Sequence, residues 1–109
     1  MSNGKDVSVE EQYPTAMHVI DEEQDFGSLV IFAVFDDSLN AFGDPFFMQN
    51  SMVALRAFDD MAQSGEHKFG KWPESYTLYR LGKMDLASGQ ITPEVPARIQ
   101  NAAESQRGE

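Results

Sequence analysis

Basic and aromatic side chains alternate in one stretch of the second half of this chain, residues 68–83. Only Glu74 opposes the positive charge within the stretch, and Glu66 lies just before it. Cations follow the phosphates of a single strand while its bases stack on aromatic rings, so this mixture is typical of a surface that binds single-stranded nucleic acid. The sequence therefore predicts nucleic-acid contacts from Lys68, Lys71, Trp72, Tyr76, Tyr79, Arg80 and Lys83.

The same aromatic residues have two other interpretations. A domain of 109 residues needs most of its large apolar side chains for the core, so Phe69 and Trp72 are also expected to cover the end of a small sheet. Tyr79 is expected on the opposite side from Tyr76, and its exposure stays open. Alternatively, exposed rings and an acidic arm serve protein assembly, with the helix or a sheet edge forming a homo-oligomer.

Catalytic and metal-binding patterns are not visible in the sequence. The adjacent acids Asp36/Asp37 and Asp59/Asp60 fall in a turn and on a helix, where neighbouring side chains point apart. His67 has no partner at a metal-ligand spacing, and the chain has no cysteine. The sequence therefore predicts a non-enzymatic protein without a metal or another cofactor.

The net charge of −10 argues against a protein that coats nucleic acid by bulk electrostatics, although a local basic site remains compatible with it. Residues 1–27 hold seven acids against Lys5 alone and are expected to form an acidic, disordered arm. We expect a folded domain over residues 28–93 and a tail over residues 94–109. No apolar run reaches the length of a membrane span, and the expected location is intracellular.

Residues 50–64 carry the strongest helical pattern. Val53, Ala54, Phe58 and Met61 fall on one side of a helix, which Asn50 or Ser51 would cap. Strands are expected at residues 28–35, which are apolar on both faces, at 41–47, where Gly43 and Pro45 limit pairing, and at 75–81. The predicted class is α+β, with a small antiparallel sheet in the order β-β-α-β-β and the amphipathic helix packed on one face.

The end of the chain carries weaker signals. The strand of residues 75–81 is expected to continue past a kink at Gly82, and residues 87–90 to form a hairpin turn. A short return strand is predicted at residues 91–93, ended by Pro93 and Pro96. A weak helical turn is expected at residues 98–103.

The segments together resemble a known family. The pattern covers roughly residues 29–103 and consists of Phe32–Asp36, Ala41-Phe42, Pro45–Phe47, Ala54–Asp59, His67, Lys71–Tyr79, Leu81-Gly82, Asp85, Gly89 and Pro96–Ala102. In order and spacing it is similar to the small nonstructural proteins of gokushovirus-type phages in the Microviridae, which are compared with the microvirus protein C.

This resemblance implies a protein made in the cytoplasm of the infected bacterium and absent from the mature capsid. It implies a role in viral single-stranded DNA synthesis and genome packaging, with single-stranded DNA or the replication complex as partner. The family offers no catalytic residues to carry over. The long acidic arm of residues 1–27 departs from the shorter relatives and is expected to mimic DNA, to occupy the basic patch or to recruit a basic partner.

Overall fold

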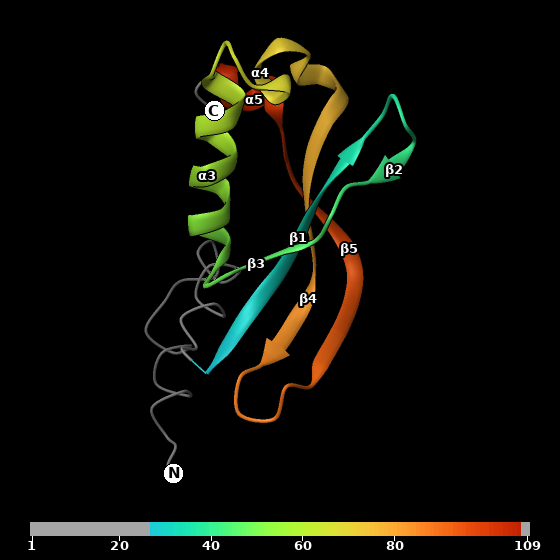
Figure 1. Cartoon of the computed structure of the whole chain (residues 1–109), viewed down its shortest axis with the longest axis vertical. Coiled ribbons are helices and arrows are strands. Elements are labelled where there is room, and N and C mark those ends of the chain that lie inside the picture. The colour runs from blue at the N-terminus through green and yellow to red at the C-terminus, as the bar shows by residue number, and fades with distance from the viewer. Residues whose placement is uncertain (1–26, 108–109) are drawn as a thin grey trace.

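The structure is a computed structural model that describes residues 27–107 and has one antiparallel sheet with a long helix along one face (Figure 1). In chain order the elements are β1 (Ser28–Asp36), β2 (Ala41–Phe42), β3 (Phe46–Met48), α3 (Ser51–Gln63), α4 (Lys68–Lys71), the 3-10 helix η3 (Pro73–Ser75), β4 (Tyr76–Asp85), β5 (Ile91–Asn101) and α5 (Ala102–Gln106). The predicted α+β class is confirmed. The predicted acidic arm lies outside the described residues, apart from Gly27.

β1 is the central strand of the sheet. It pairs along its whole length with β4 on one edge, and with β2 and β3 on the other. Its side chains Val30, Phe32 and Val34 face α3, and Ile31 and Ala33 on the opposite face are buried as well. A continuous β-branched and aromatic run is therefore needed here, as the sequence indicated.

α3 packs closely on the sheet because small side chains line the face that contacts it. Asn50 caps it by accepting a hydrogen bond from the Val53 backbone N–H at 2.9 Å, as predicted. Ala54 and Ala62 let the helix approach closely, and Phe58 fills the space between them. Full burial of such a ring is worth about 1.5–3 kcal/mol. The helix ends at Ser64 in extended conformation, without the left-handed glycine that often follows a helix.

The last part of the chain differs from its prediction. β5 continues past Pro93 and Pro96 to Asn101, where the sequence suggested that the strand ended at residue 93. Among the described strands, β5 pairs with β4 alone, and prolines are tolerated on such an outer edge. Asn101 then starts α5 with a capping box, in which its backbone N–H donates to Glu104 Oε1 at 2.9 Å. The predicted tail and the turn at 98–103 are therefore wrong, and residues 94–106 belong to the fold.

Bulges decide which face each β4 side chain occupies. Register shifts occur between Ile31 and Phe32 of β1 and beside Gly82 of β4, where the sequence predicted a kink. Tyr76, Leu78 and Arg80 alternate along β4 with less buried residues, and all three face α3. After the bulge Lys83 pairs with Val30 and lies on the α3 face too.

α4 is held against the end of α3 by a close backbone contact. A Cβ atom built on Gly70 would overlap the Ser64 carbonyl oxygen. Gln106 of α5 bridges the two helices, because its side-chain amide donates to Ala62 O and to Gly70 O, both at 2.9 Å. Gly70 therefore fixes the position of α4.

Replacing Gly70 with alanine should destabilise the protein by about 1–3 kcal/mol, because α4 must move away from α3 to admit the methyl group. Equilibrium unfolding in urea measures this free energy. Gly65→Ala is the matched control, since a Cβ there meets nothing within 4 Å. Equal unfolding midpoints for the two variants would contradict the close contact.

Candidate nucleic-acid interface

Three of the seven predicted contact residues, Lys68, Lys71 and Trp72, lie together on α4 and at its end, and all three are exposed. Trp72 is 60% exposed, so the interpretation that placed it in the core is wrong. Its N–H donates to Lys68 O at 3.0 Å and its carbonyl accepts from Ser75 N–H at 3.1 Å. The backbone on both sides of the indole is thus fixed while the ring projects. We call this group the α4 end.

His67 positions the α4 end from within the protein. Its Nδ1 accepts a hydrogen bond from the Phe69 backbone N–H at 3.0 Å and so caps α4. Its ring lies edge-on to Phe69 at 4.4 Å between centroids. His67 therefore has a structural role in the loop where sequence reasoning found no partner for it.

Tyr76 belongs to the core instead of the surface. Its residue is 7% exposed and its ring packs on Phe69 at 4.7 Å between centroids. Lys68 Nζ lies 5.7 Å from the centre of the Tyr76 ring. Burial, followed by the nearby charge of Asp36, raises the pKa of the Tyr76 hydroxyl. The prediction that this ring offers a stacking surface is wrong, because strand alternation turns it towards α3.

Arg80 is buried and already paired. Its Nε donates to Glu94 Oε1 at 2.8 Å and its Nη2 donates to Glu94 Oε2 at 3.1 Å. Such a two-pronged pair fixes the planar guanidinium and neutralises its charge. The prediction that Arg80 binds phosphate therefore does not fit its environment. The cause is the length of β5, which brings Glu94 across from β4.

Replacing Arg80 with alanine should lower the free energy of unfolding by about 1–3 kcal/mol, because Glu94 loses its partner and a buried side chain is removed. The expected loss is limited because a third of the Glu94 side chain is exposed, where solvent screens the ion pair. Urea unfolding measures it, and Lys83→Ala serves as the control. An unchanged midpoint for the Arg80 variant would show that the pair is not structural.

Tyr79 and Lys83 lie away from the α4 end. Lys83 is seven residues beyond Tyr76 along β4, about 23 Å at the rise of a strand. Tyr79 is half-buried on the sheet face opposite α3, as predicted relative to Tyr76. There it meets Phe42 and Phe35, with ring centroids 5.3 and 6.4 Å away. The single continuous surface that the sequence suggested is therefore divided among three places.

Two aromatic residues on that face were missed at the sequence level. Phe42 of β2 pairs with Phe35 of β1, and their centroids are 5.0 Å apart. The turn signal of residues 36–40 indicates a hairpin, and a hairpin places these two positions side by side. The hairpin signal in the sequence could therefore have predicted that Phe35 and Phe42 lie next to each other.

Three carboxylates are held in their charged form by local hydrogen bonds. The Ser38 hydroxyl, which donates to Asp36 Oδ1 at 2.6 Å, is the main cause that lowers the pKa of Asp36. The Ser88 hydroxyl has the same effect on the pKa of Asp85. The Asn101 backbone N–H lowers the pKa of Glu104. Each of these bonds closes a turn or caps a helix.

These shifts predict acid-sensitive folding. A carboxylate with a lowered folded-state pKa stabilises the protein fully above its unfolded-state pKa, and this contribution is lost as the pH falls through the folded-state value. The urea midpoint should therefore decrease below the ordinary aspartate pKa of 3.8. Asp85→Asn should flatten this decrease relative to the exposed control Asp44→Asn. A midpoint independent of pH between neutral and acid solution would contradict the assignment.

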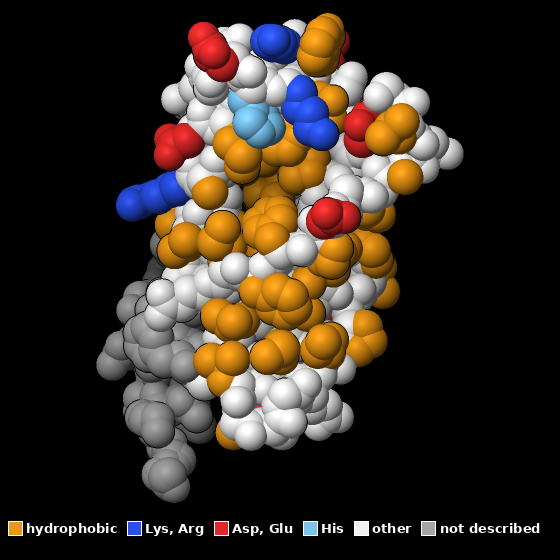
Figure 2. Space-filling view, viewed as in Figure 1, with side chains coloured by type: hydrophobic (Ala, Val, Ile, Leu, Met, Phe, Trp, Pro, Cys, Tyr) orange, Lys and Arg blue, Asp and Glu red, His pale blue; other side chains and the backbone are white. Residues whose placement is uncertain are grey.

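The view in Figure 2 shows how the surface is divided. Hydrophobic side chains are visible along the length of this face, while Lys and Arg side chains lie in its upper part, where α4 is found. Asp and Glu side chains are interspersed with them. The basic character of the α4 end is therefore local.

Within residues 27–107, no helix is long and apolar enough to cross a membrane. The same residues contain no group of three or more His, Cys, Asp or Glu side chains that would hold a metal ion.

Comparison with the models of known protein families gives a match. Residues 29–105 match the model of a family described as phage ORF5 protein. No curated protein matches the chain. No solved structure matches it either. The matched residues run from β1 to α5 and include the α4 end and the aromatic residues of both sheet faces.

Proposed function

The chain belongs to the phage ORF5 protein family and is thus a bacteriophage protein, and on this premise we propose that it is a non-enzymatic accessory protein of viral single-stranded DNA synthesis and genome packaging. It acts in the cytoplasm of the infected bacterium, as a nonstructural protein of a Microviridae-type phage. It contacts single-stranded DNA at the α4 end. The observation that carries this proposal is the exposed Trp72 indole beside two exposed lysines on a fixed backbone.

The chemistry of the α4 end suits a single strand. An exposed indole provides a flat face on which any base can stack, and the ammonium groups of Lys68 and Lys71 provide contacts to the phosphates on either side. Because hydrogen bonds fix the backbone before and after Trp72, little freedom is lost when a base stacks on it. Such an arrangement recognises single strands without reading their whole sequence.

Electrostatics set the strength of this contact. Glu66 and Glu74 are exposed near the lysines, and the chain carries a net charge of −10. Binding should therefore be weak and localised, with about two phosphates neutralised. For single-stranded DNA this corresponds to a slope of roughly −1.4 in a plot of log affinity against log salt concentration.

The test is the affinity of a labelled single-stranded oligonucleotide, measured by fluorescence anisotropy at several salt concentrations. Trp72→Ala should weaken binding by about 1–3 kcal/mol, the value of one stacked base. Lys71→Ala should reduce the salt slope by about 0.7. Lys83→Ala, at the other end of β4, is the matched control and should change neither quantity. Salt-independent binding, or equal losses in the Lys71 and Lys83 variants, would refute the site.

A second function, protein assembly without nucleic acid, is favoured by the sheet face opposite α3. Phe42 and Phe47 are both 41% exposed there, and Phe42 lies beside the half-buried Tyr79 and Phe35. Exposed aromatic side chains of this kind are typical of protein interfaces. If the protein binds no single strand, and light scattering gives a mass above that of the monomer that Phe42→Ser lowers, the homo-oligomeric adaptor function replaces the first proposal.

A further inference from the structure

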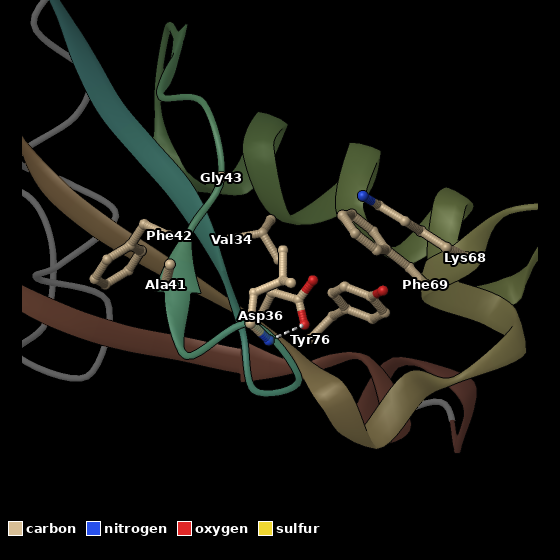
Figure 3. Close-up of a pocket in the computed structure, with 9 residues that line it drawn as sticks. Val34, Asp36, Ala41, Phe42, Gly43, Lys68, Phe69 and Tyr76 are labelled. Carbon is tan, nitrogen blue, oxygen red and sulfur yellow. Dashed lines mark hydrogen bonds between the residues drawn. The ribbon is translucent and has the colours of Figure 1, made fainter.

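A pocket lies beside the α4 end, between the end of β1, the turn that follows it, and the first residues of α4 and β4 (Figure 3). Apolar atoms of Val34, Leu39 and Phe69 form much of its wall. Three polar groups also line it, from Asp36, Lys68 and Tyr76. Its volume is about 110 Å³. A closed cavity of about 150 Å³ is known to hold a benzene molecule, so this smaller pocket has room for one six-membered ring only where the ring extends through its open mouth.

Asp36 is the unusual residue of the pocket because it is only 9% exposed and uses one of its two oxygens for the fold. Oδ1 accepts hydrogen bonds from the N–H groups of Ser38 and Leu39 and from the Ser38 hydroxyl. Oδ2 accepts none from the described residues. Figure 3 shows it pointing away from the turn, towards the rings of Phe69 and Tyr76.

A carboxylate oxygen that lines a pocket and accepts no hydrogen bond from the fold is available to a ligand, because a charged acceptor is stabilised by each donor it gains. The hydrogen bonds from Ser38 keep the pKa of Asp36 low, so the carboxyl group is ionised at neutral pH and can only accept. A ligand must therefore present an N–H or O–H group to it. Tyr76 and Lys68 add a hydroxyl and an ammonium group as donors on another side.

We propose that this pocket binds one cytosine base of the single strand, with its exocyclic amino group donating to Asp36 Oδ2. The ring nitrogen and carbonyl oxygen of the base accept from the Tyr76 hydroxyl and the Lys68 ammonium group, and its ring packs against Val34, Leu39 and Phe69. This inference rests on the proposed function. It adds base preference to a contact that stacking alone would leave tolerant of sequence.

Thymine and the purines fit this pocket less well than cytosine does. Thymine carries a carbonyl oxygen where cytosine has the amino group, and this would place two acceptors face to face. Purines have two rings and exceed the space for one. Aspartate accepting from the cytosine amino group is an established pairing in base recognition.

The pocket and Trp72 can serve neighbouring nucleotides. Lys68 lines the pocket and begins the helical turn that Trp72 ends, four residues later, about 6 Å along a helix. One base can thus enter the pocket while the next stacks on the indole. Lys68 then lies between them, close to the connecting phosphate.

The experiment compares the affinities of labelled oligo(dC) and oligo(dT) for the full chain and its variants. The wild-type protein should bind oligo(dC) roughly fivefold or more tightly. Asp36→Asn keeps an oxygen for the turn but presents an amino group to the pocket. The preference should therefore disappear or reverse towards oligo(dT). Asp37→Asn, which removes the same charge from the adjacent exposed residue, should keep the wild-type preference.

A second variant tests the pocket independently, in case Asp36→Asn disturbs the fold. Tyr76→Phe keeps the buried ring and removes only the hydroxyl, so it should weaken oligo(dC) binding and leave oligo(dT) binding unchanged. Circular dichroism verifies the fold of each variant.

The possible failures are distinguishable. Equal wild-type affinity for both oligonucleotides, with both weakened by Trp72→Ala, would overturn the base pocket and leave the proposed function intact. If Asp36→Asn and Asp37→Asn had equal effects, Asp36 would act only through its charge. This result would also overturn the base pocket. Binding of neither oligonucleotide would overturn both proposals.

Discussion

The pairing of β1 on both of its edges, with buried side chains on both of its faces, is the constraint on which the rest of this structure depends. β2 and β3 on one edge and β4 on the other are ordered by hydrogen bonds to this one strand. Its alternate side chains anchor α3 on one face and the aromatic group around Phe35 on the other. Its last residue, Asp36, reaches the pocket beside α4. One strand thus positions both surfaces that are candidates for binding.

The acidic composition and a nucleic-acid function are compatible because the few cations are used selectively. Arg80 and Arg98 are paired with Glu94 and Glu104, and so contribute to the fold. Lys68 and Lys71 remain exposed on a short helix whose place is fixed by Gly70 and Gln106. Local charge and a rigid support then matter more than the net charge of the chain, which limits binding to a small site.

Much of the fold could be predicted because it follows from local patterns. The α3 periodicity, the Asn50 cap and the apolar run of β1 each report directly on burial or backbone hydrogen bonding. The extent of β5 could not be predicted. Prolines 93 and 96 argue against a strand unless its edge position is known, and that position depends on the pairing of the whole sheet. The candidate site was predicted only in part for the same reason. Its composition is visible in residues 68–83, but the separation of Trp72, Tyr79 and Arg80 depends on bulges and on Glu94, which is distant in sequence.

The pocket illustrates a further limit. In the sequence Asp36 is one of two adjacent acids in a turn, and that interpretation is correct for its Oδ1 atom. The second oxygen lines a pocket because α4 and the start of β4 pack beside it, and the proposed base contact depends on that tertiary arrangement. A residue can thus satisfy a local turn and still present an acceptor to a ligand. Local sequence patterns report only the first of these.

The prolines of β5 also restrict how copies of this protein can meet. An outer strand with free amide groups recruits further strands and can seed open-ended aggregates. At positions 93 and 96 the backbone has no N–H to donate, so a neighbouring strand cannot pair continuously along it. Extension of the sheet by strand addition along β5 is thereby hindered.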